Sequence, residues 1–136
     1  MRLTRRLDFC ASHRLERSDW EPERNRTVFG PEPGTGEFGH NYRLEVTVGG
    51  VPDPETGMVI DLKRLKQVLV EEVEERFDHR NLNDDTSFFR DRAPTPEQFA
   101  LLIFELLERA LPDGLLHQVR LSPAEDCFVD VTRDAR

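Results

Sequence analysis

The sequence lacks the features of several large protein classes. It has only two cysteines, Cys10 and Cys127, and no C-x-x-C pair, so we expect neither a disulfide framework nor a cysteine-based metal site. Both cysteines lie in predicted strands, where we expect them to be small buried hydrophobic residues. No apolar run is long enough to span a membrane, and no apolar segment follows the basic residues 1–6, so we expect a cytoplasmic protein without a signal peptide.

The sequence also lacks an excess of positive charge. The 27 acidic residues outnumber the 19 basic ones and give a net charge of −8, which argues against nucleic acid or an anionic membrane as a partner. With 136 residues and 37% hydrophobic side chains, the chain can bury one core but not two. We therefore expect a single domain that spans residues 1–136.

Two runs of alternating apolar and polar residues predict strands. In the run 3–13, one face carries Leu3, Leu7, Phe9 and Ala11. In the run 40–48, every even-numbered position points to one face and is apolar after the first, which is a histidine. A period of two is typical of half-buried strands in an antiparallel sheet.

Histidines lie at the two strand ends that should meet. His13 falls at the end of the first apolar face, and His40 begins the second. If the two strands pair antiparallel, both histidines lie close together on one face. The segment 14–39 between them is rich in proline and glycine, and loops of this length are usually functional or disordered.

Two helices are expected after the second strand. Asp61 is a suitable N-cap for a helix over residues 62–77, which carries leucine, valine and phenylalanine at helical spacing. Thr95 is a suitable N-cap for a second helix that reaches about residue 111, with Gln98 closing a capping box.

Two shorter strands are expected near residues 117–121 and 127–131. The element order is then ββααββ. The predicted fold class is α+β, an antiparallel sheet with both helices on one face.

The pair Asp78-His79 directly follows the first predicted helix, in the segment FDHRNLN (77–83). A carboxylate beside an imidazole fixes its tautomer and stabilises the charged ring, as proton transfer requires. The other interpretation is a histidine placed favourably at the end of a helix dipole.

Five segments together resemble the 6-pyruvoyl-tetrahydropterin synthase family, which includes the 6-carboxy-tetrahydropterin synthases. They are FCASHRL (9–15), GHNY (39–42), GMVIDL (57–62), FDHRNLN (77–83) and PTPE (94–97). The resemblance implies the tunnelling (T-) fold, in which ββααββ subunits assemble into a barrel as trimers or hexamers with active sites at subunit interfaces. It also implies zinc as cofactor and 7,8-dihydroneopterin triphosphate as the usual substrate.

The resemblance implies roles for six residues that match the family's motifs. They are His13 and His40 as zinc ligands, Asp78 and His79 as the catalytic pair, and Thr95 and Glu97 as residues near the substrate.

Three positions depart from the family's pattern. Phe38 stands where the family has a third zinc-binding histidine, and Glu32 stands where it has a catalytic cysteine. The glutamate that anchors the pterin ring is displaced, and Glu125 is the nearest candidate. A catalytic zinc normally has three protein ligands, so Glu37 or Glu32 could complete the site; the alternative is a chain without metal.

The predicted function is a pterin-processing lyase that uses metal-assisted proton abstraction on 7,8-dihydroneopterin triphosphate or a related dihydropterin. One alternative follows a branch of the family in which glutamate replaces the cysteine: Glu32 would act as base in a side-chain cleavage that yields 6-hydroxymethyl-dihydropterin. Another alternative is a paralogue that binds a pterin or purine-like ring without catalysis.

Overall fold

Five strands form one sheet in the order β3-β1-β2-β4-β5 in the computed structural model, which describes residues 1–30 and 38–135. The strands β1 (Arg2–His13), β2 (Phe38–Gly49), β4 (Leu116–Ala124) and β5 (Cys127–Thr132) are antiparallel neighbours, as the alternating pattern predicts. The short β3 (Arg80–Asn81) adds a parallel strand at the β1 edge that the pattern does not reveal.

The register of β1 and β2 places the predicted apolar faces together. Ala11 pairs with His40, and His13 pairs with Phe38. A shift by one residue would turn every inward side chain of one strand to solvent, so the alternating pattern excludes such a shift.

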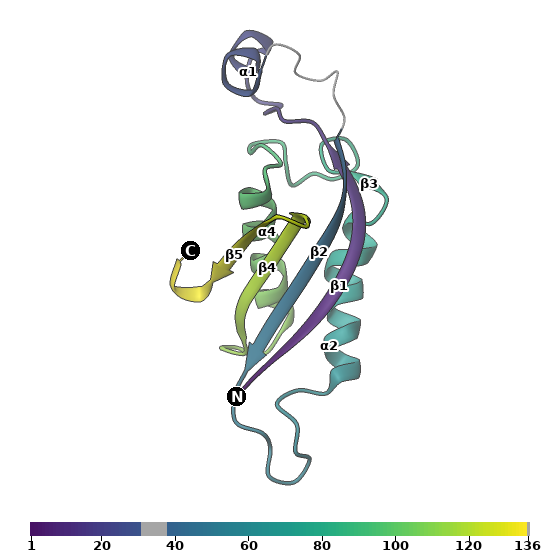
Figure 1. Ribbon diagram of the computed structural model, residues 1–136, viewed down its shortest axis with the longest axis vertical. Coiled ribbons are helices and arrows are strands. Elements are labelled where there is room, and N and C mark those ends of the chain that lie inside the picture. The colour runs from purple at the N-terminus through teal and green to yellow at the C-terminus, as the bar shows by residue number, and fades with distance from the viewer. Residues whose placement is uncertain (31–37, 136) are drawn as a thin grey trace.

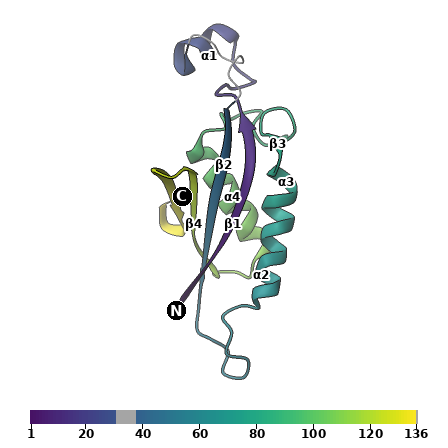
Figure 2. The same cartoon turned by 45° about the vertical axis from the view of Figure 1, so that its right-hand side comes forward.

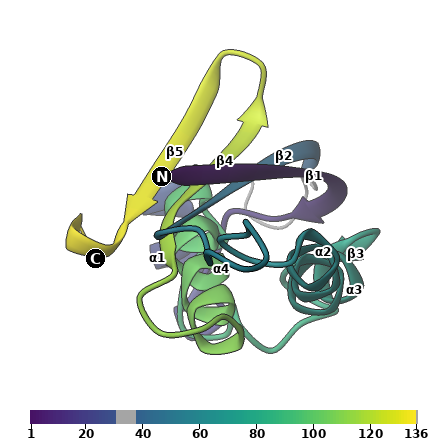
Figure 3. The ribbon, with the colours of Figure 1, turned by 90° about the horizontal axis from the view of Figure 1, so that it is seen from below.

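The helical run α2 (Leu62–Leu69), η1 (Val70–Glu74) and α3 (Glu75–Phe77) covers the same face of the sheet as α4 (Pro96–Ala110). Figure 3 shows the sheet as one layer and these helices as the second. This confirms the predicted α+β class with the two main helices on one face.

The first helical run begins at its predicted cap, since Asp61 accepts a hydrogen bond from the Lys63 N–H at 2.9 Å. Its buried residues Leu65, Leu69, Val73 and Phe77 recur every four positions, slightly more than one α-helical turn. The π-helical segment η1 has more residues per turn than an α-helix. We attribute to this wider turn the inward direction of Val73 and Phe77, which a regular α-helix would rotate away from the core. Leu62, on the first turn of α2, is 48% exposed.

The helix α4 also begins where predicted. The Thr95 hydroxyl accepts from the Gln98 N–H at 3.2 Å, but the reciprocal bond of a capping box is replaced, because the Thr95 N–H donates to the Ala93 carbonyl at 2.9 Å. Half of the predicted capping box is therefore present.

The segment between β1 and β2 contains a helix that the sequence interpretation missed. The helix α1 (Pro22–Phe29) lies beyond the end of the sheet (Figures 1 and 2). Trp20 stacks on Phe29 at 5.7 Å between ring centroids, and the Arg24 guanidinium lies 3.8 Å from the Trp20 ring. The helix is short and buries only Asn25, so it leaves no apolar stripe in the sequence.

An aromatic group fills the core between the sheet and α4. Phe99 packs edge-on against Phe77 at 5.0 Å and against Tyr42 at 5.2 Å between ring centroids.

The expectation of buried cysteines is wrong for Cys127, which is exposed on the edge strand β5, and Cys10 is only partly buried. Within residues 1–30 and 38–135, no helix combines the length and the apolar composition that crossing a membrane requires.

Candidate active site

His13 and His40 lie side by side at the end of the sheet that carries α1. Their rings are nearly parallel, with 5.1 Å between centroids and 15° between planes. They come from diagonal positions of neighbouring strands on one face, because Ala11 is the direct partner of His40. The predicted adjacency of the two histidines is confirmed.

Burial makes His13 a neutral imidazole. The side chain is 4% exposed, and burial, assisted by the nearby His40, lowers the pKa of His13 to about 4. Tyr42, two residues after His40 on the same face, places its hydroxyl 3.5 Å from Nδ1 of His13. Burial raises the pKa of Tyr42, so its hydroxyl stays protonated.

The chemistry of this pair fits part of a zinc site. Neutral imidazole is the form that binds zinc, and two imidazoles on neighbouring strands could supply two of the usual three protein ligands. Among the described residues there is no group of three histidine, cysteine, aspartate or glutamate side chains that could hold a metal. The two candidates for the third ligand, Glu32 and Glu37, lie outside the described residues.

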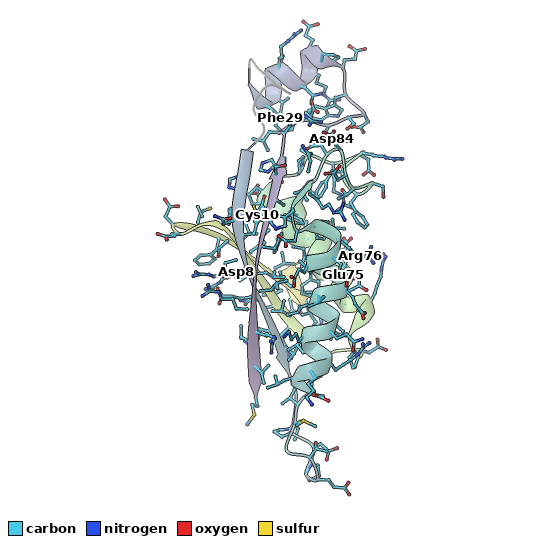
Figure 4. All side chains as sticks on the ribbon, turned by 90° about the vertical axis from the view of Figure 1, so that its right-hand side faces the viewer. Asp8, Cys10, Phe29, Glu75, Arg76 and Asp84 are labelled. Atoms are coloured by element: carbon cyan, nitrogen blue, oxygen red, sulfur yellow. The ribbon has the colours of Figure 1, made fainter. Side chains whose placement is uncertain are left out.

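Asp78 and His79 lie at the outer edge of β1, where they form hydrogen bonds with the backbone N–H and the carbonyl of Cys10. The Asp78 Oδ1 atom accepts from the Cys10 N–H at 2.9 Å, and the His79 N–H donates to the Cys10 carbonyl at 2.6 Å. His79 has φ of +59°, a left-handed conformation that turns the chain from the helix onto the strand. Figure 4 shows Cys10 on β1 beside the helical run that carries Glu75 and Arg76.

The arrangement of this pair suits proton transfer. With Oδ1 bound to the strand, Asp78 places Oδ2 3.7 Å from Nε2 of His79. The His79 side chain is 82% exposed, so it can reach groups outside this chain. A carboxylate that is fixed by the backbone and lies beside an exposed imidazole can stabilise the protonated ring.

A hollow of about 540 Å³ opens on the face of the sheet opposite the helices, beside the β4–β5 hairpin. Six of its lining residues are His40, Arg43, Arg120, Ser122, Glu125 and Phe128. Glu125, an exposed residue of the hairpin turn, lines this hollow, and His40 borders it with its ring on the other face of the sheet, beside His13 and Tyr42.

Thr95 and Glu97 do not line this hollow. Thr95 caps α4, and Glu97 lies exposed on the first turn of that helix. Within one chain, these two residues therefore do not share the hollow with Glu125, the third predicted substrate residue.

Sequence reasoning missed two residues near the histidines. Tyr42 shares the face of His40, so the period of the strand was a sufficient signal for it. Asn83 binds the backbone of Arg14, directly after His13, and only its place in the segment 77–83 marked it.

Together the sheet, its two helices, the histidine pair and the Asp-His pair define a subunit of the tunnelling-fold class. The chain belongs to the 6-pyruvoyl tetrahydropterin synthase family, whose model matches residues 2–134.

Similar proteins agree with this membership. Human 6-pyruvoyl tetrahydrobiopterin synthase is 38% identical over 127 residues, which cover 93% of this chain and 88% of that protein. The 6-carboxy-5,6,7,8-tetrahydropterin synthase of Rickettsia typhi is 26% identical and covers 96% of this chain and 99% of its own. Membership supports the prediction of a pterin-processing lyase.

Solved structures extend the likeness to three dimensions. Caenorhabditis elegans 6-pyruvoyl tetrahydropterin synthase matches with a TM-score of 0.87 and 30% identity, over 97% of this chain and 94% of that one. The Plasmodium vivax 6-pyruvoyl tetrahydropterin synthase matches with a TM-score of 0.68 and 15% identity, over 98% of this chain and 98% of that one, and shares the fold.

Proposed function

We propose that this protein is a metal-assisted lyase that acts on 7,8-dihydroneopterin triphosphate or a related dihydropterin. The observation that carries the proposal is the pair of stacked imidazoles, His13 and His40, with His13 held neutral by burial. His13 is buried and His40 is partly buried beside it, so two imidazoles lie together at the rim of the core, and burial holds one of them neutral. The predicted use is to bind zinc.

His13 and His40 would hold the metal together with a carboxylate, Glu37 or Glu32. Bound zinc would supply a Lewis acid that acidifies the hydroxyls of the pterin side chain and the carbons beside them. The chain's own groups then move the protons. Glu32 is the proposed base, and the fixed carboxylate of Asp78 stabilises the charge that His79 acquires when it accepts or passes a proton.

Substrate contacts are proposed for Glu125, Thr95 and Glu97. Glu125 lines the hollow beside the β4–β5 hairpin, on the face of the sheet opposite the His40 ring. The exposed His79 and Glu97 would act on a substrate that lies between subunits, so we propose that the protein works as a homo-oligomer, a trimer or hexamer.

A second candidate function is the cleavage that yields 6-hydroxymethyl-dihydropterin. It is favoured by Glu32, which stands in the position of the family's catalytic cysteine. In the Plasmodium vivax structures, a glutamate described as a catalytic residue was replaced by alanine or cysteine. A carboxyl whose pKa is raised in a half-buried pocket is a competent base.

Product analysis separates these functions. The purified protein is incubated with 7,8-dihydroneopterin triphosphate, with and without a chelator, and the pterins are identified by mass spectrometry. A chelator-sensitive elimination product supports the lyase, and 6-hydroxymethyl-dihydropterin supports the cleavage. If no dihydropterin turns over, both enzymatic proposals fail, and binding without product supports the non-catalytic alternative.

The third metal ligand is tested by substitution. Glu37→Gln and Glu32→Gln are prepared separately, and bound zinc per chain is measured by elemental analysis. Only the variant that removes the ligand should lose zinc. Phe38→His should tighten zinc binding by about tenfold or more, because it restores a third imidazole in the family's position. If Phe38→His also binds no zinc, the metal-assisted proposal is wrong.

The Asp-His pair is tested at its exposed member. His79→Gln should lower kcat by roughly 100-fold or more, because a general acid–base group is lost. Zinc stoichiometry and thermal stability should stay unchanged, since the side chain is exposed and is not one of the proposed zinc ligands. An unchanged kcat would rule out proton transfer by His79.

A further inference from the structure

The segment 78–83 lies along the outer edge of β1 and holds it at successive positions. The Asp78 carboxylate and the His79 N–H bind the backbone of Cys10, at 2.9 and 2.6 Å. The parallel pairing of β3 follows, and the Leu82 N–H then donates to the Ser12 carbonyl at 2.8 Å. We call this series of hydrogen bonds between the segment 78–83 and β1 the ladder. The Asp78 side chain begins it, and backbone groups continue it toward His13.

Asn83 ends this ladder with a second side chain. Its Oδ1 atom accepts from the Arg14 N–H at 2.7 Å, and its Nδ2 group donates to the Arg14 carbonyl at 3.1 Å. One amide side chain therefore satisfies both backbone groups of Arg14, as a neighbouring strand would do. Asn83 is itself held, because its N–H donates to Oδ1 of Asn81 at 2.9 Å.

Arg14 is the first residue after β1. The strand ends at His13, and the chain then leaves the sheet toward α1. Strand ends fray unless their backbone groups are held, and the imidazole of His13 is attached to the last residue of this strand. The bonds from Asn83 fix the backbone directly after His13, so they limit how far its ring can move from the ring of His40.

We propose that Asn83 is a positioning residue for His13: by pairing with both backbone groups of Arg14 it holds the His13 ring where the histidine pair can bind metal. The inference rests on the proposed function for its consequence in zinc affinity. It also couples the two halves of the site, because one ladder carries the Asp78-His79 pair at one end and Asn83 at the other.

The test compares Asn83→Ala with a matched control, Asp84→Ala. Asp84 is the next residue and also binds Arg14, but only its guanidinium, at 2.7 and 2.8 Å. Figure 4 places Asp84 toward the end of the molecule that carries Phe29. The control therefore removes a tether to the same residue and leaves its backbone bonds intact.

Zinc affinity is measured by competition with a chromophoric chelator. Asn83→Ala should weaken it by about tenfold or more, the size of effect seen when groups that orient metal ligands are lost. Asp84→Ala should leave it unchanged. Asn83→Asp keeps an acceptor for the Arg14 N–H but loses the donor to the Arg14 carbonyl, so its affinity should fall between those of the unaltered protein and Asn83→Ala.

A second readout uses the metal-free protein. In Asn83→Ala the Arg14 amide should exchange with solvent faster, and the ring proton signals of His13 and His40 should shift, because stacked rings shield each other. If the Arg14 amide exchanges faster but the histidine signals and zinc affinity are unchanged, the positioning role is wrong. If the unaltered protein binds no zinc, the metal proposal fails, and the ring signals alone decide the role of Asn83.

Discussion

At the scale of single residues, His13 combines four structural features of the site. It ends a strand, it is buried, it stacks on His40, and Tyr42 approaches its ring from the same face. Burial first, and then the neighbouring His40, lower the pKa of His13 and favour the neutral imidazole. The residue is therefore held in the form that a metal requires, and protonation would oppose its place in the fold.

The lowered pKa of His13 predicts a pH dependence of stability in the metal-free protein. Between pH 6.5 and about 4, the unfolded chain binds a proton that the folded chain does not, so stability falls as the pH is lowered through this window. The loss attributable to His13 should reach up to about 3 kcal/mol. Chemical denaturation in a chelator, from pH 7 to 4, measures it.

Carboxylates also titrate in this window, so the effect is read as a difference between variants. His13→Gln should show a flatter dependence of unfolding free energy on pH than the unaltered protein. His79→Gln, which changes an exposed ring, should keep the steeper dependence. Equal slopes in all three proteins would contradict the assignment to His13.

At the scale of the elements, α4 gives Thr95 a structural task beside its proposed contact with substrate. Its hydroxyl satisfies the Gln98 N–H at the start of a helix whose inner face fills the core. Testing the two roles of Thr95 separately requires a variant that keeps the helix cap but loses the threonine hydroxyl. Thr95→Asp is such a variant, since aspartate caps a helix as well as threonine does.

Thr95→Ala should lower the free energy of unfolding by about 1 kcal/mol, because the first turn of α4 loses its cap. Thr95→Asp should keep the stability, since its carboxylate can accept the same bond. If Thr95 also contacts the substrate through its hydroxyl, Thr95→Asp should raise KM while the stability holds. Denaturant titration and steady-state kinetics on both variants separate the two tasks, and an unchanged KM in Thr95→Asp limits Thr95 to capping.

At the scale of the whole molecule, the sheet has two open edges. Of the strands described, only β3 pairs with the outer edge of β1, at Ala11 and Ser12, and β5 forms the opposite edge. Open edges promote pairing with other chains. A barrel of several copies would close both, which agrees with the proposed trimer or hexamer.

A proline at the β1 edge should weaken this assembly. Cys10 directs its N–H outward, to Asp78, so Arg6, four positions earlier, does the same. Arg6→Pro removes an outward donor and should shift the protein toward monomers in light scattering. Arg5→Pro instead removes a donor that faces β2 and should destabilise the fold. A monomeric unaltered protein at micromolar concentration would overturn the proposed oligomer.

The sequence by itself determined the main sheet and the histidine pair. The period of two puts His13 and His40 on the buried faces of their strands, and antiparallel pairing brings the end of the first strand to the start of the second. The helix caps Asp61 and Thr95 were equally readable, because capping depends on residues within one turn.

Only the tertiary structure decided the rest of the site. The ladder from Asp78 to Asn83 joins residues about seventy positions apart, and Glu125 reaches the hollow beside His40 through the pairing of β4 with β2. The helix α1 likewise leaves no periodic signal. Local patterns record which face of an element is buried, whereas contacts between distant segments depend on how those faces pack together.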